Sequence, residues 1–291
     1  MSKKINTFGA VLGDAYDLIL KKPSLLFPLT IVAFLEGLWL ELLYFTPQHP
    51  LSTVFLPPVK RFFGEMATHY PAYLFLIPKF FGRGQQLLIF LFFGGVLTAA
   101  TTLLAASASE NHPLTFSAAW KKIRGRVLTL ILLSLFTLTL IGFIMGREFT
   151  FFKVGFDFAH KGPLFKILRF LLRSARYLNF LLAIAIQSFT VFLFPFAVLE
   201  NRGFFRAIGN SFMLGWKQFK RIFVLLLVPT LCYSPLWFLK GNLSMLVQRT
   251  RCPEAILWVL GVGIVASLLV DTFIAVSATL FFLRVRHEKS A

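Results

Sequence analysis

Six long apolar stretches divide the chain and are separated by shorter, more polar segments. Each is close to the ~20 residues that a helix needs to cross a bilayer. They lie at Leu25–Phe45, Gln85–Ser109, Val127–Met145, Leu178–Leu199, Ile222–Leu239 and Ala255–Leu283. Their apolar residues are continuous and do not alternate every second position, which favours helices over the strands of a membrane barrel. The pattern predicts an all-α, polytopic membrane helix bundle of about six spans.

A shorter helix with one apolar face is predicted immediately before the first, third and fifth spans. The apolar positions are Phe8, Val11, Leu12, Ala15, Leu18 and Ile19 in the first helix, Phe116, Ala119, Trp120, Ile123 and Val127 in the second, and Phe205, Ile208, Phe212, Trp216 and Phe219 in the third. These residues recur at spacings of about three or four, as on one face of a helix. Each segment is too polar to span, so we expect it to lie in the membrane–water interface.

One amphipathic helix followed by two spans therefore occurs three times. Phe8 and Val11 align with Phe205 and Ile208 at one constant offset, without gaps. We predict a single integral membrane domain, residues 1–291, built from repeats at 5–109, 113–199 and 203–283. Unrelated juxtamembrane helices would give the same pattern, and this alternative stays open.

The segments on the other side of the predicted membrane differ from simple turns. Residues 46–84 contain six prolines, so regular structure there should be short and interrupted. Residues 164–176 alternate aliphatic and basic positions at helical spacing, which predicts a further interfacial helix.

The composition agrees with a membrane protein. Hydrophobic residues make up 57% of the chain and charged residues 14%, whereas a soluble domain is about a quarter charged. The first apolar stretch begins only at Leu25 and no small-residue cleavage site follows, so we expect it to remain as a span. Cys232 and Cys252 have no metal-binding spacing and are expected to be free thiols.

The chain is strongly basic, with a net charge of +18 from 30 Lys and Arg against 12 Asp and Glu. These residues lie in loops and at span ends, so we expect the lipid bilayer and its anionic headgroups as partners, and no nucleic acid. Their distribution slightly favours cytoplasmic N- and C-termini. The candidate contacts to anionic lipid are Lys121, Lys122, Arg124, Arg206, Lys217, Lys220 and Arg221.

Three acidic residues lie inside predicted spans, with no Lys or Arg at similar depth in the sequence. Glu36 and Glu41 are in the first span and Asp271 is in the sixth. Ionisable groups inside a membrane are costly, about 2.5–3.5 kcal/mol on insertion scales, and are functional candidates for that reason. Glu36, Asp271 and Gln187 of the fourth span form a candidate polar site for a proton or a cation. Alternatively, each acid is protonated and bonded to a Ser or Thr of a facing helix.

No catalytic or metal-binding pattern accompanies these acids. The five histidines fall in loops or the C-terminal tail, never two at a metal-ligand spacing. Neither a nucleophile elbow nor a phosphate-binding glycine pattern occurs. We therefore expect no enzymatic activity, no metal and no cofactor. Gly94, Gly95, Gly261 and Gly263 are interpreted as close contacts between helices.

The segment from Pro195 to Gly215 reads PFAVLENRGFFRAIGNSFMLG. It resembles a recurring motif of bacterial multi-pass proteins that include the membrane domain fused to some glycerophosphodiester phosphodiesterases. Phe8–Pro23 and Thr115–Trp120 resemble two further elements of that group. The resemblance implies a bacterial inner-membrane protein of six helices, with interfacial helices between pairs of spans. It implies no catalytic residues, because the phosphodiesterase activity belongs to a separate soluble domain.

Two functions follow from these observations. The first is a non-enzymatic scaffold or accessory protein that engages anionic lipid, a membrane-protein partner or a second copy of itself. The second is a transporter or channel component for a small or lipid-like solute, with Glu36 and Asp271 in the pathway. The high phenylalanine content and the lack of paired intramembrane charge favour the first. The two functions are distinguished by whether the two acids face one another across a wet cavity.

Overall fold

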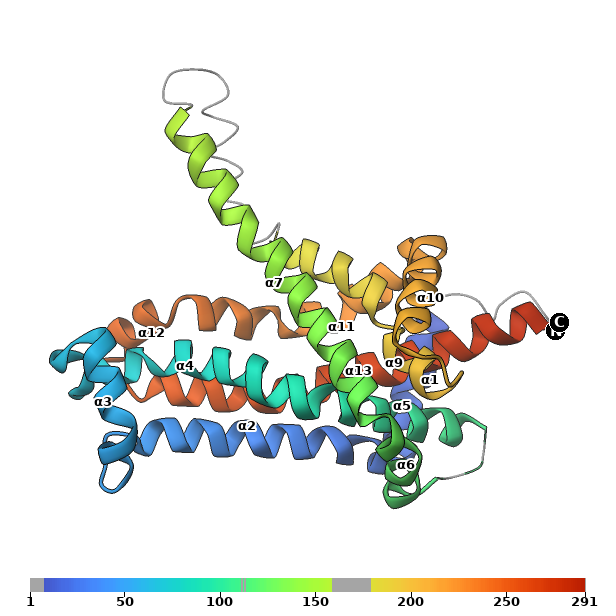
Figure 1. Cartoon of the computed structure of the whole chain (residues 1–291), viewed down its shortest axis with the longest axis horizontal. Coiled ribbons are helices and arrows are strands. Elements are labelled where there is room, and N and C mark those ends of the chain that lie inside the picture. Colours follow the sequence, from blue (N-terminus) through green and yellow to red (C-terminus); the bar gives the residue numbers. More distant parts are fainter. Residues whose placement is uncertain (1–7, 111, 113, 159–178, 291) are drawn as a thin grey trace.

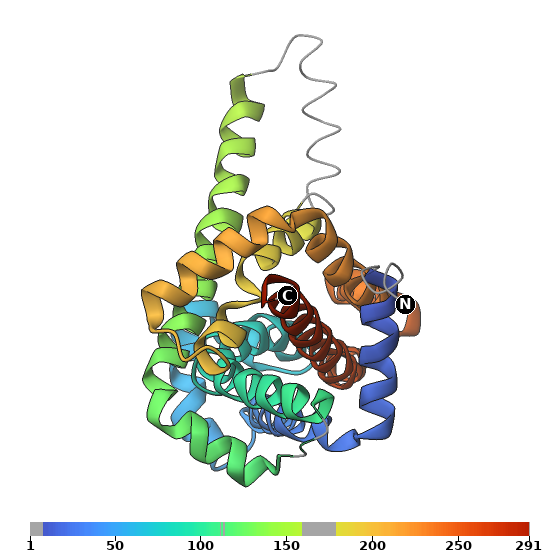
Figure 2. The same cartoon turned by 90° about the vertical axis from the view of Figure 1, so that its right-hand side faces the viewer.

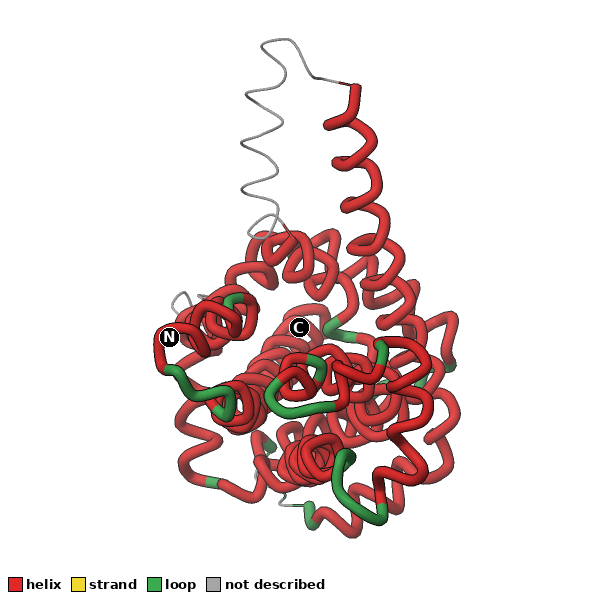
Figure 3. The backbone as a smooth tube through the Cα atoms, turned by 90° about the vertical axis from the view of Figure 1, so that its left-hand side faces the viewer, coloured by secondary structure: helices red, strands yellow, loops and turns green. Residues whose placement is uncertain are grey.

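The computed structural model describes residues 8–290 except 111, 113 and 159–178. Within these residues the chain is helical, and no strand occurs (Figure 3). Six segments are long and apolar enough to cross a membrane, namely Pro23–Phe45, Ala72–Ser109, Phe116–Phe143, Asn179–Val198, Phe219–Gly241 and Ala255–Glu288. The all-α polytopic bundle expected from the apolar pattern is therefore confirmed, and we number these spans one to six.

The α-helices follow one another with short connections. They are α1 (Phe8–Lys21), α2 (Phe27–Phe45), α3 (Leu51–Phe63), α4 (Ile77–Gly84), α5 (Gly95–Ser109), α6 (Phe116–Ile123), α7 (Val127–Phe158), α9 (Leu193–Val198), α10 (Phe204–Lys217), α11 (Phe219–Gly241), α12 (Leu243–Thr250) and α13 (Ala255–Ser290). Residues 179–190 are also helical and lead into α9. A π-helical stretch, Gln85–Gly94, joins α4 to α5. The second span therefore starts before the predicted Gln85, since α4 includes the exposed Lys79 and Arg83 that ended the apolar run.

The last helix is the centre of the bundle. Figure 1 shows α2, the α4–α5 helix and α11 running alongside α13, whereas α7 crosses this group at an angle and leads away from it. α13 packs against α1, α2, α5 and α11. Its buried positions include the small residues Ala275, Ser277 and Ala278. Small residues allow neighbouring helices to approach closely, which is how helices associate where lipid removes the hydrophobic driving force.

The short helices before spans one, three and five form as separate elements, at one end of the bundle. Figure 2 shows α1 in blue, α6 in green and α10 in orange around the C-terminal end of α13. α1 is linked to that end by an ion pair between Asp14 and Arg284. α10 packs closely on the fourth span, because a Cβ on Gly215 would meet the Cα of Phe189 at 2.9 Å.

At this end of the bundle, basic side chains donate hydrogen bonds to carbonyls in the last turns of two spans. Lys22, just before the first span, donates a hydrogen bond of 3.1 Å to the carbonyl of Ala108 in the last turn of α5. Arg126, just before α7, donates one of 2.7 Å to the carbonyl of Ala197 in the last turn of α9. A cation at a helix C-terminus satisfies a carbonyl that has no partner inside the helix. The first two predicted repeats thus share one type of contact, and the threefold repeat itself stays a prediction.

The opposite end of the bundle is covered by residues 46–84. They form α3, with Pro57 and Pro58 inside it, followed by two short 3-10 turns. Tyr73, Leu74 and Ile77 of this segment are buried against residues of α2, α12 and α13. The expectation of short, interrupted structure is confirmed. The interfacial helix predicted at 164–176 lies outside the described residues.

Candidate functional site

A cavity of about 380 Å³ lies between five of the six spans. Spans one, two, three, four and six line it, and α11 does not. Its lining residues are Leu29, Val32, Glu36, Gln85, Phe90, Gly94, Thr98, Thr102, Thr137, Leu138, Ile141, Gln187, Thr190, Val191, Phe194, Pro195, Asp271, Ile274, Ala275 and Ala278. The three residues of the predicted polar site, Glu36, Gln187 and Asp271, all belong to this set.

Helical spacing explains why each span presents these side chains on one face. In α13 the lining residues Asp271, Ile274, Ala275 and Ala278 follow the pattern i, i+3, i+4, i+7, as on one side of an α-helix. In the second span Gln85 and Phe90 are five apart, and the following lining residues recur every four. The wider spacing falls inside the π-helical stretch, where hydrogen bonds join residues five apart. The π-helical stretch therefore brings Gln85 onto the cavity face of its helix.

Glu36 is held at the wall of the cavity by one hydrogen bond. Its side chain is 5% exposed, and Gln85 Nε2 donates to Glu36 Oε1 over 2.7 Å. Glu36 Oε2 is buried and has no hydrogen-bond partner among the described residues. A buried polar atom without a partner costs about 1–3 kcal/mol, so this oxygen is a place where a ligand would gain affinity.

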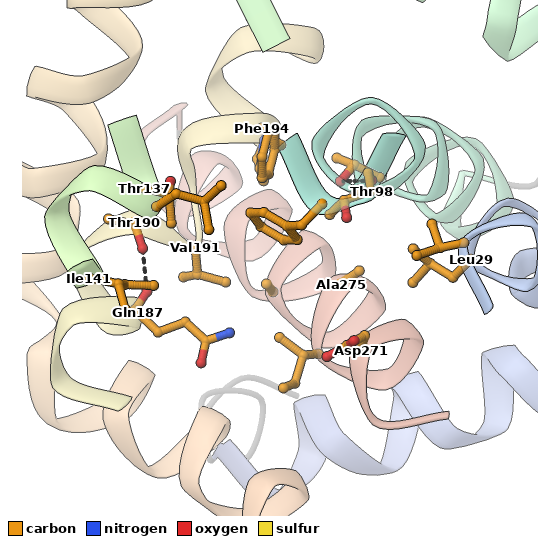
Figure 4. A pocket seen from close by; sticks show the side chains of 18 of the residues that line it. Leu29, Thr98, Thr137, Ile141, Gln187, Thr190, Val191, Phe194, Asp271 and Ala275 are labelled. Atoms are coloured by element: carbon orange, nitrogen blue, oxygen red, sulfur yellow. Dashed lines mark hydrogen bonds between the residues drawn. The ribbon is translucent and has the colours of Figure 1, made fainter. Parts of the chain in front are cut away.

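Asp271 supplies a second carboxyl from the central helix. Its side chain lines the cavity and keeps accessible surface there, although protein atoms surround it closely, and its charge interacts with that of Glu36. Figure 4 shows Gln187 extending from the fourth span toward the helix that carries Asp271 and Ala275. Two carboxyls that face one apolar volume repel each other when both are ionised, and a cation between them relieves that repulsion.

Threonine hydroxyls add hydrogen-bond acceptors to the cavity. The hydroxyls of Thr102, Thr137 and Thr190 lie within hydrogen-bonding distance of carbonyls one turn earlier in their own helices, at 3.0, 2.9 and 3.3 Å. Each hydroxyl has a single donor, so these bonds leave only oxygen lone pairs for a ligand. With the two carboxyls and the amide oxygens, the polar lining consists mainly of acceptors.

The structure adds three facts about this site that the sequence pattern missed. Gln85 stood at the edge of an apolar run and was not singled out, although its amide is the hydrogen-bond partner of Glu36. The alternative interpretation assigned that partnership to a Ser or Thr. Glu41 is exposed and does not line the cavity. The sequence showed no Lys or Arg at similar depth to the acids, and no basic residue is among the described residues that line the cavity.

The predicted lipid contacts lie on the outside of the bundle. All seven basic residues, Lys121, Lys122, Arg124, Arg206, Lys217, Lys220 and Arg221, are exposed. On α10, Arg206 and Lys217 follow directly in sequence two large apolar residues, Phe205 and Trp216, which are 84% and 78% exposed. The face of α10 that packs on the bundle consists instead of Ala207, Ser211, Leu214 and Gly215.

The glycines differ in what they contact. A Cβ on Gly95 would overlap Ser134 Oγ and meet the ring of Phe194, which confirms a close contact between three spans. Gly263 lies against the side chain of Lys240 from α11. For Gly94 the nearest atoms belong to Phe90 of the same helix. Around Gly261 nothing lies within 4 Å, so the expectation for Gly261 was wrong.

The described residues contain no group of three or more His, Cys, Asp or Glu side chains that could hold a metal ion. Cys232 and Cys252 are both exposed and free, as expected. No family model, no curated protein and no solved structure matches this chain. The resemblance to the membrane domain of glycerophosphodiester phosphodiesterases therefore stays a prediction from the sequence.

Proposed function

We propose that this protein is a transporter or channel component that takes a small cation into the cavity between spans one, two, three, four and six. One observation carries the proposal. Glu36 and Asp271, far apart in the sequence, line the same intramembrane cavity, and no basic residue is among the described residues that line it. Acids that face one another across a wet cavity would distinguish a solute pathway from a scaffold, and two acids on one cavity support the pathway.

The chemistry of the lining indicates the charge of the solute. The cavity offers two carboxyls, two carboxamide oxygens and the lone pairs of threonine hydroxyls, and Glu36 Oε2 has no partner among the described residues. A cation is stabilised by such acceptors, and more strongly inside a membrane protein than in water because the effective dielectric constant is lower. The volume of about 380 Å³ falls in the range of small-molecule sites.

A monovalent cation fits this lining better than a divalent metal ion. Calcium takes six to eight oxygen ligands, usually with several carboxylates, and transition metals prefer His or Cys. The cavity combines two carboxyls with neutral oxygens, a set that suits a sodium ion or a small organic ammonium. Both solutes share the same chemistry, and a binding experiment with each distinguishes them.

The distribution of the basic residues is the basis for the location that we propose. We place the protein in the bacterial inner membrane with both termini in the cytoplasm, so that α1, α6 and α10 meet the anionic cytoplasmic surface. The three helices lie at the same end of the bundle, as this orientation requires (Figure 2). The proposed activity is movement of a solute and involves no covalent chemistry.

Equilibrium binding to the purified protein tests the proposal. Radiolabelled sodium and radiolabelled methylammonium are measured separately, by scintillation proximity at low ionic strength. Glu36→Gln and Asp271→Asn should each weaken binding of the preferred ion at least about tenfold, since each removes one of two charges. Glu41→Gln changes an exposed acid of the same helix and should leave binding unchanged. Wild-type protein that binds neither ion would refute the proposal.

A second candidate function rests on a different observation. On α10 the exposed Phe205 and Trp216 directly precede Arg206 and Lys217 in sequence, the combination that favours an interfacial helix on anionic lipid. A scaffold or accessory protein would use this surface to hold lipid, a membrane-protein partner or a second copy. The two functions are compatible, because the cavity and α10 are separate parts of the bundle.

A further inference from the structure

A second pocket lies at the end of the bundle where α10 is found, between α9, α10 and the C-terminal part of α13. Its volume is about 310 Å³, at the lower end of the range for small-molecule sites. It is separate from the cavity between the spans, because the two have no lining residue in common. Among the residues that line it are Arg202 and Lys217, so this pocket, unlike the cavity, contains basic side chains. We call it the α10 pocket.

One face of α10 forms a wall of the α10 pocket. Asn210, Met213, Leu214, Lys217 and Gln218 follow the pattern i, i+3, i+4, i+7, i+8, as on one side of a helix. The amides of Asn210 and Gln218 and the ammonium of Lys217 therefore line the same volume. None of these three side chains has a hydrogen bond or an ion pair with another residue that the structure describes. Their donors are free for a ligand.

The turn between α9 and α10 adds an arginine that is held in place. The backbone N–H of Arg202 donates a hydrogen bond of 3.1 Å to the carbonyl of Phe196, and Asn201 between them has a left-handed φ of 57°. Asn adopts this conformation more readily than most residues. In the same turn, Arg202 Nε donates to Glu200 Oε2 over 3.2 Å. The two terminal nitrogens of the guanidinium have no partner in the described part of the chain.

The charges of the α10 pocket favour an anion. Its two basic side chains exceed its one acid, Glu200, and that carboxylate already accepts the Arg202 hydrogen bond. The helix ends favour neither sign, because α10 ends and α11 begins at Gln218 and their end charges are opposite. Apolar surface from Phe196 and Val285 limits the water in the pocket and so strengthens the interaction with a charged ligand.

We infer that the α10 pocket binds a phosphate ester, through Arg202 and Lys217 with the amides of Asn210 and Gln218 as further donors. Four donor side chains from two walls of one pocket suit a tetrahedral phosphate, which has more acceptor oxygens than a carboxylate, and the paired terminal nitrogens of an arginine match two of those oxygens. The headgroup of an anionic phospholipid and a soluble phosphate ester both present this group. The inference is independent of the proposed cation pathway, because it concerns a different pocket.

Native mass spectrometry of the purified full chain tests the inference with two probes, short-chain phosphatidylglycerol and soluble glycerol phosphate. Arg202→Gln combined with Lys217→Gln should weaken binding at least about tenfold, since both charged donors are lost. The matched control, Arg206→Gln with Lys220→Gln, removes the same charges from exposed residues outside the pocket and should weaken binding about twofold at most.

Two further variants separate the pocket from net charge and from folding. Asn210→Leu removes an amide donor at constant net charge and should weaken binding at least about threefold. Lys217→Gln alone leaves the Glu200–Arg202 pair intact and replaces the double variant if that protein does not fold. Size-exclusion profiles and thermal midpoints are recorded for each, so that affinities are compared between intact proteins.

Weaker binding in the pocket variants, with little change in the control, supports the inference. Binding of phosphatidylglycerol alone then identifies a membrane lipid as the ligand, whereas equal affinity for glycerol phosphate identifies a soluble ester. Equal losses in the two double variants overturn the inference, since net charge would explain them. Wild type that binds neither probe, or Asn210→Leu that binds as wild type does, overturns it as well. Binding of sodium and methylammonium should be the same in all these variants, so this test fails or succeeds separately from the proposed function.

Discussion

Gln85 Nε2 donates a hydrogen bond of 2.7 Å to Glu36 Oε1 and so joins the first two spans at the wall of the cavity. The bond exists because the π-helical stretch turns Gln85 onto the face that meets α2. π-Helical segments are rare and occur frequently at functional sites. A carboxyl held on one oxygen, with its second oxygen unused, is suited to receive a positively charged solute.

Replacing Gln85 by Leu should lower the thermal stability of the protein. The substitution leaves both oxygens of the buried Glu36 without a donor, at a cost of about 1–3 kcal/mol. Thermal unfolding of the solubilised protein, followed by intrinsic fluorescence, measures the shift. Gln187→Leu is the matched control, because Gln187 lines the same cavity without bonding to Glu36. Equal losses in the two variants would show that the Gln85–Glu36 bond contributes nothing specific.

Replacing Gly95 by Ala should destabilise the contact between spans two, three and four. The new Cβ overlaps Ser134 Oγ and comes within 2.9 Å of the Phe194 ring, and both neighbours are buried. Overpacking of this kind costs about 1–3 kcal/mol. Because Phe194 lines the cavity, cation binding should weaken as well.

Two further variants check the Gly95 prediction. Gly142→Ala in α7 has nothing within 4 Å and should be neutral or slightly stabilising, since Ala is the better helix former. Ser134→Ala removes the nearest overlapping atom and should restore part of the stability when combined with Gly95→Ala. If Gly95→Ala behaves like Gly142→Ala, the spans pack less closely than described.

The basic residues of the third predicted interfacial helix should retain anionic lipid. Arg206, Lys217, Lys220 and Arg221 are all exposed, and each basic group near an anionic surface contributes about 1 kcal/mol. Changing all four to Gln should reduce the cardiolipin and phosphatidylglycerol that copurify with the protein, measured by lipid mass spectrometry. Four exposed basic residues at the other end of the bundle serve as the control set, namely Arg61, Lys79, Arg83 and Arg249. Equal lipid loss in both sets would indicate an effect of net charge alone.

The contact between Tyr70 and Glu254 should make stability depend on pH at the end of the bundle covered by residues 46–84. The Tyr70 hydroxyl donates 2.8 Å to Glu254 Oε1, and this bond lowers the pKa of Glu254 below its ordinary 4.5. The same bond raises the pKa of Tyr70 above 10.0. A lowered carboxyl pKa adds stability above pH 4.5, and that stability is lost as the pH falls through the pKa of the folded state.

Tyr70→Phe should therefore flatten the acid side of the stability profile. Thermal midpoints of wild type and variant should differ most above pH 4.5 and converge as the pH falls below it. On the alkaline side, wild type should also lose its advantage as Tyr70 ionises above pH 10.0. Tyr16→Phe, an exposed tyrosine of α1, is the control. Parallel profiles for wild type and Tyr70→Phe would contradict the prediction.

The sequence by itself determined the number of spans and the fold class. Apolar runs near the thickness of a bilayer must satisfy their backbone hydrogen bonds internally, so their length fixes them as helices wherever they pack. The sequence also located the separate short helices before spans one, three and five, because the apolar residues of an interfacial helix recur at helical spacing within the segment itself. Glu36, Gln187 and Asp271 stood out for a similarly local reason, since each is a polar residue inside an apolar run.

Only the tertiary structure decided that these three residues line one cavity. The face that each helix turns toward the cavity is set by its packing against the neighbouring helices, which no single span encodes. The inclusion of Gln85 depended on a local change from α- to π-helical hydrogen bonding, which an apolar run with the ordinary helical period does not show. The contact of the Lys240 side chain with α13 depended on the space that Gly263 leaves in a helix distant in sequence. Each of these is a relationship between helices, and it arises only when their side chains compete for the same space.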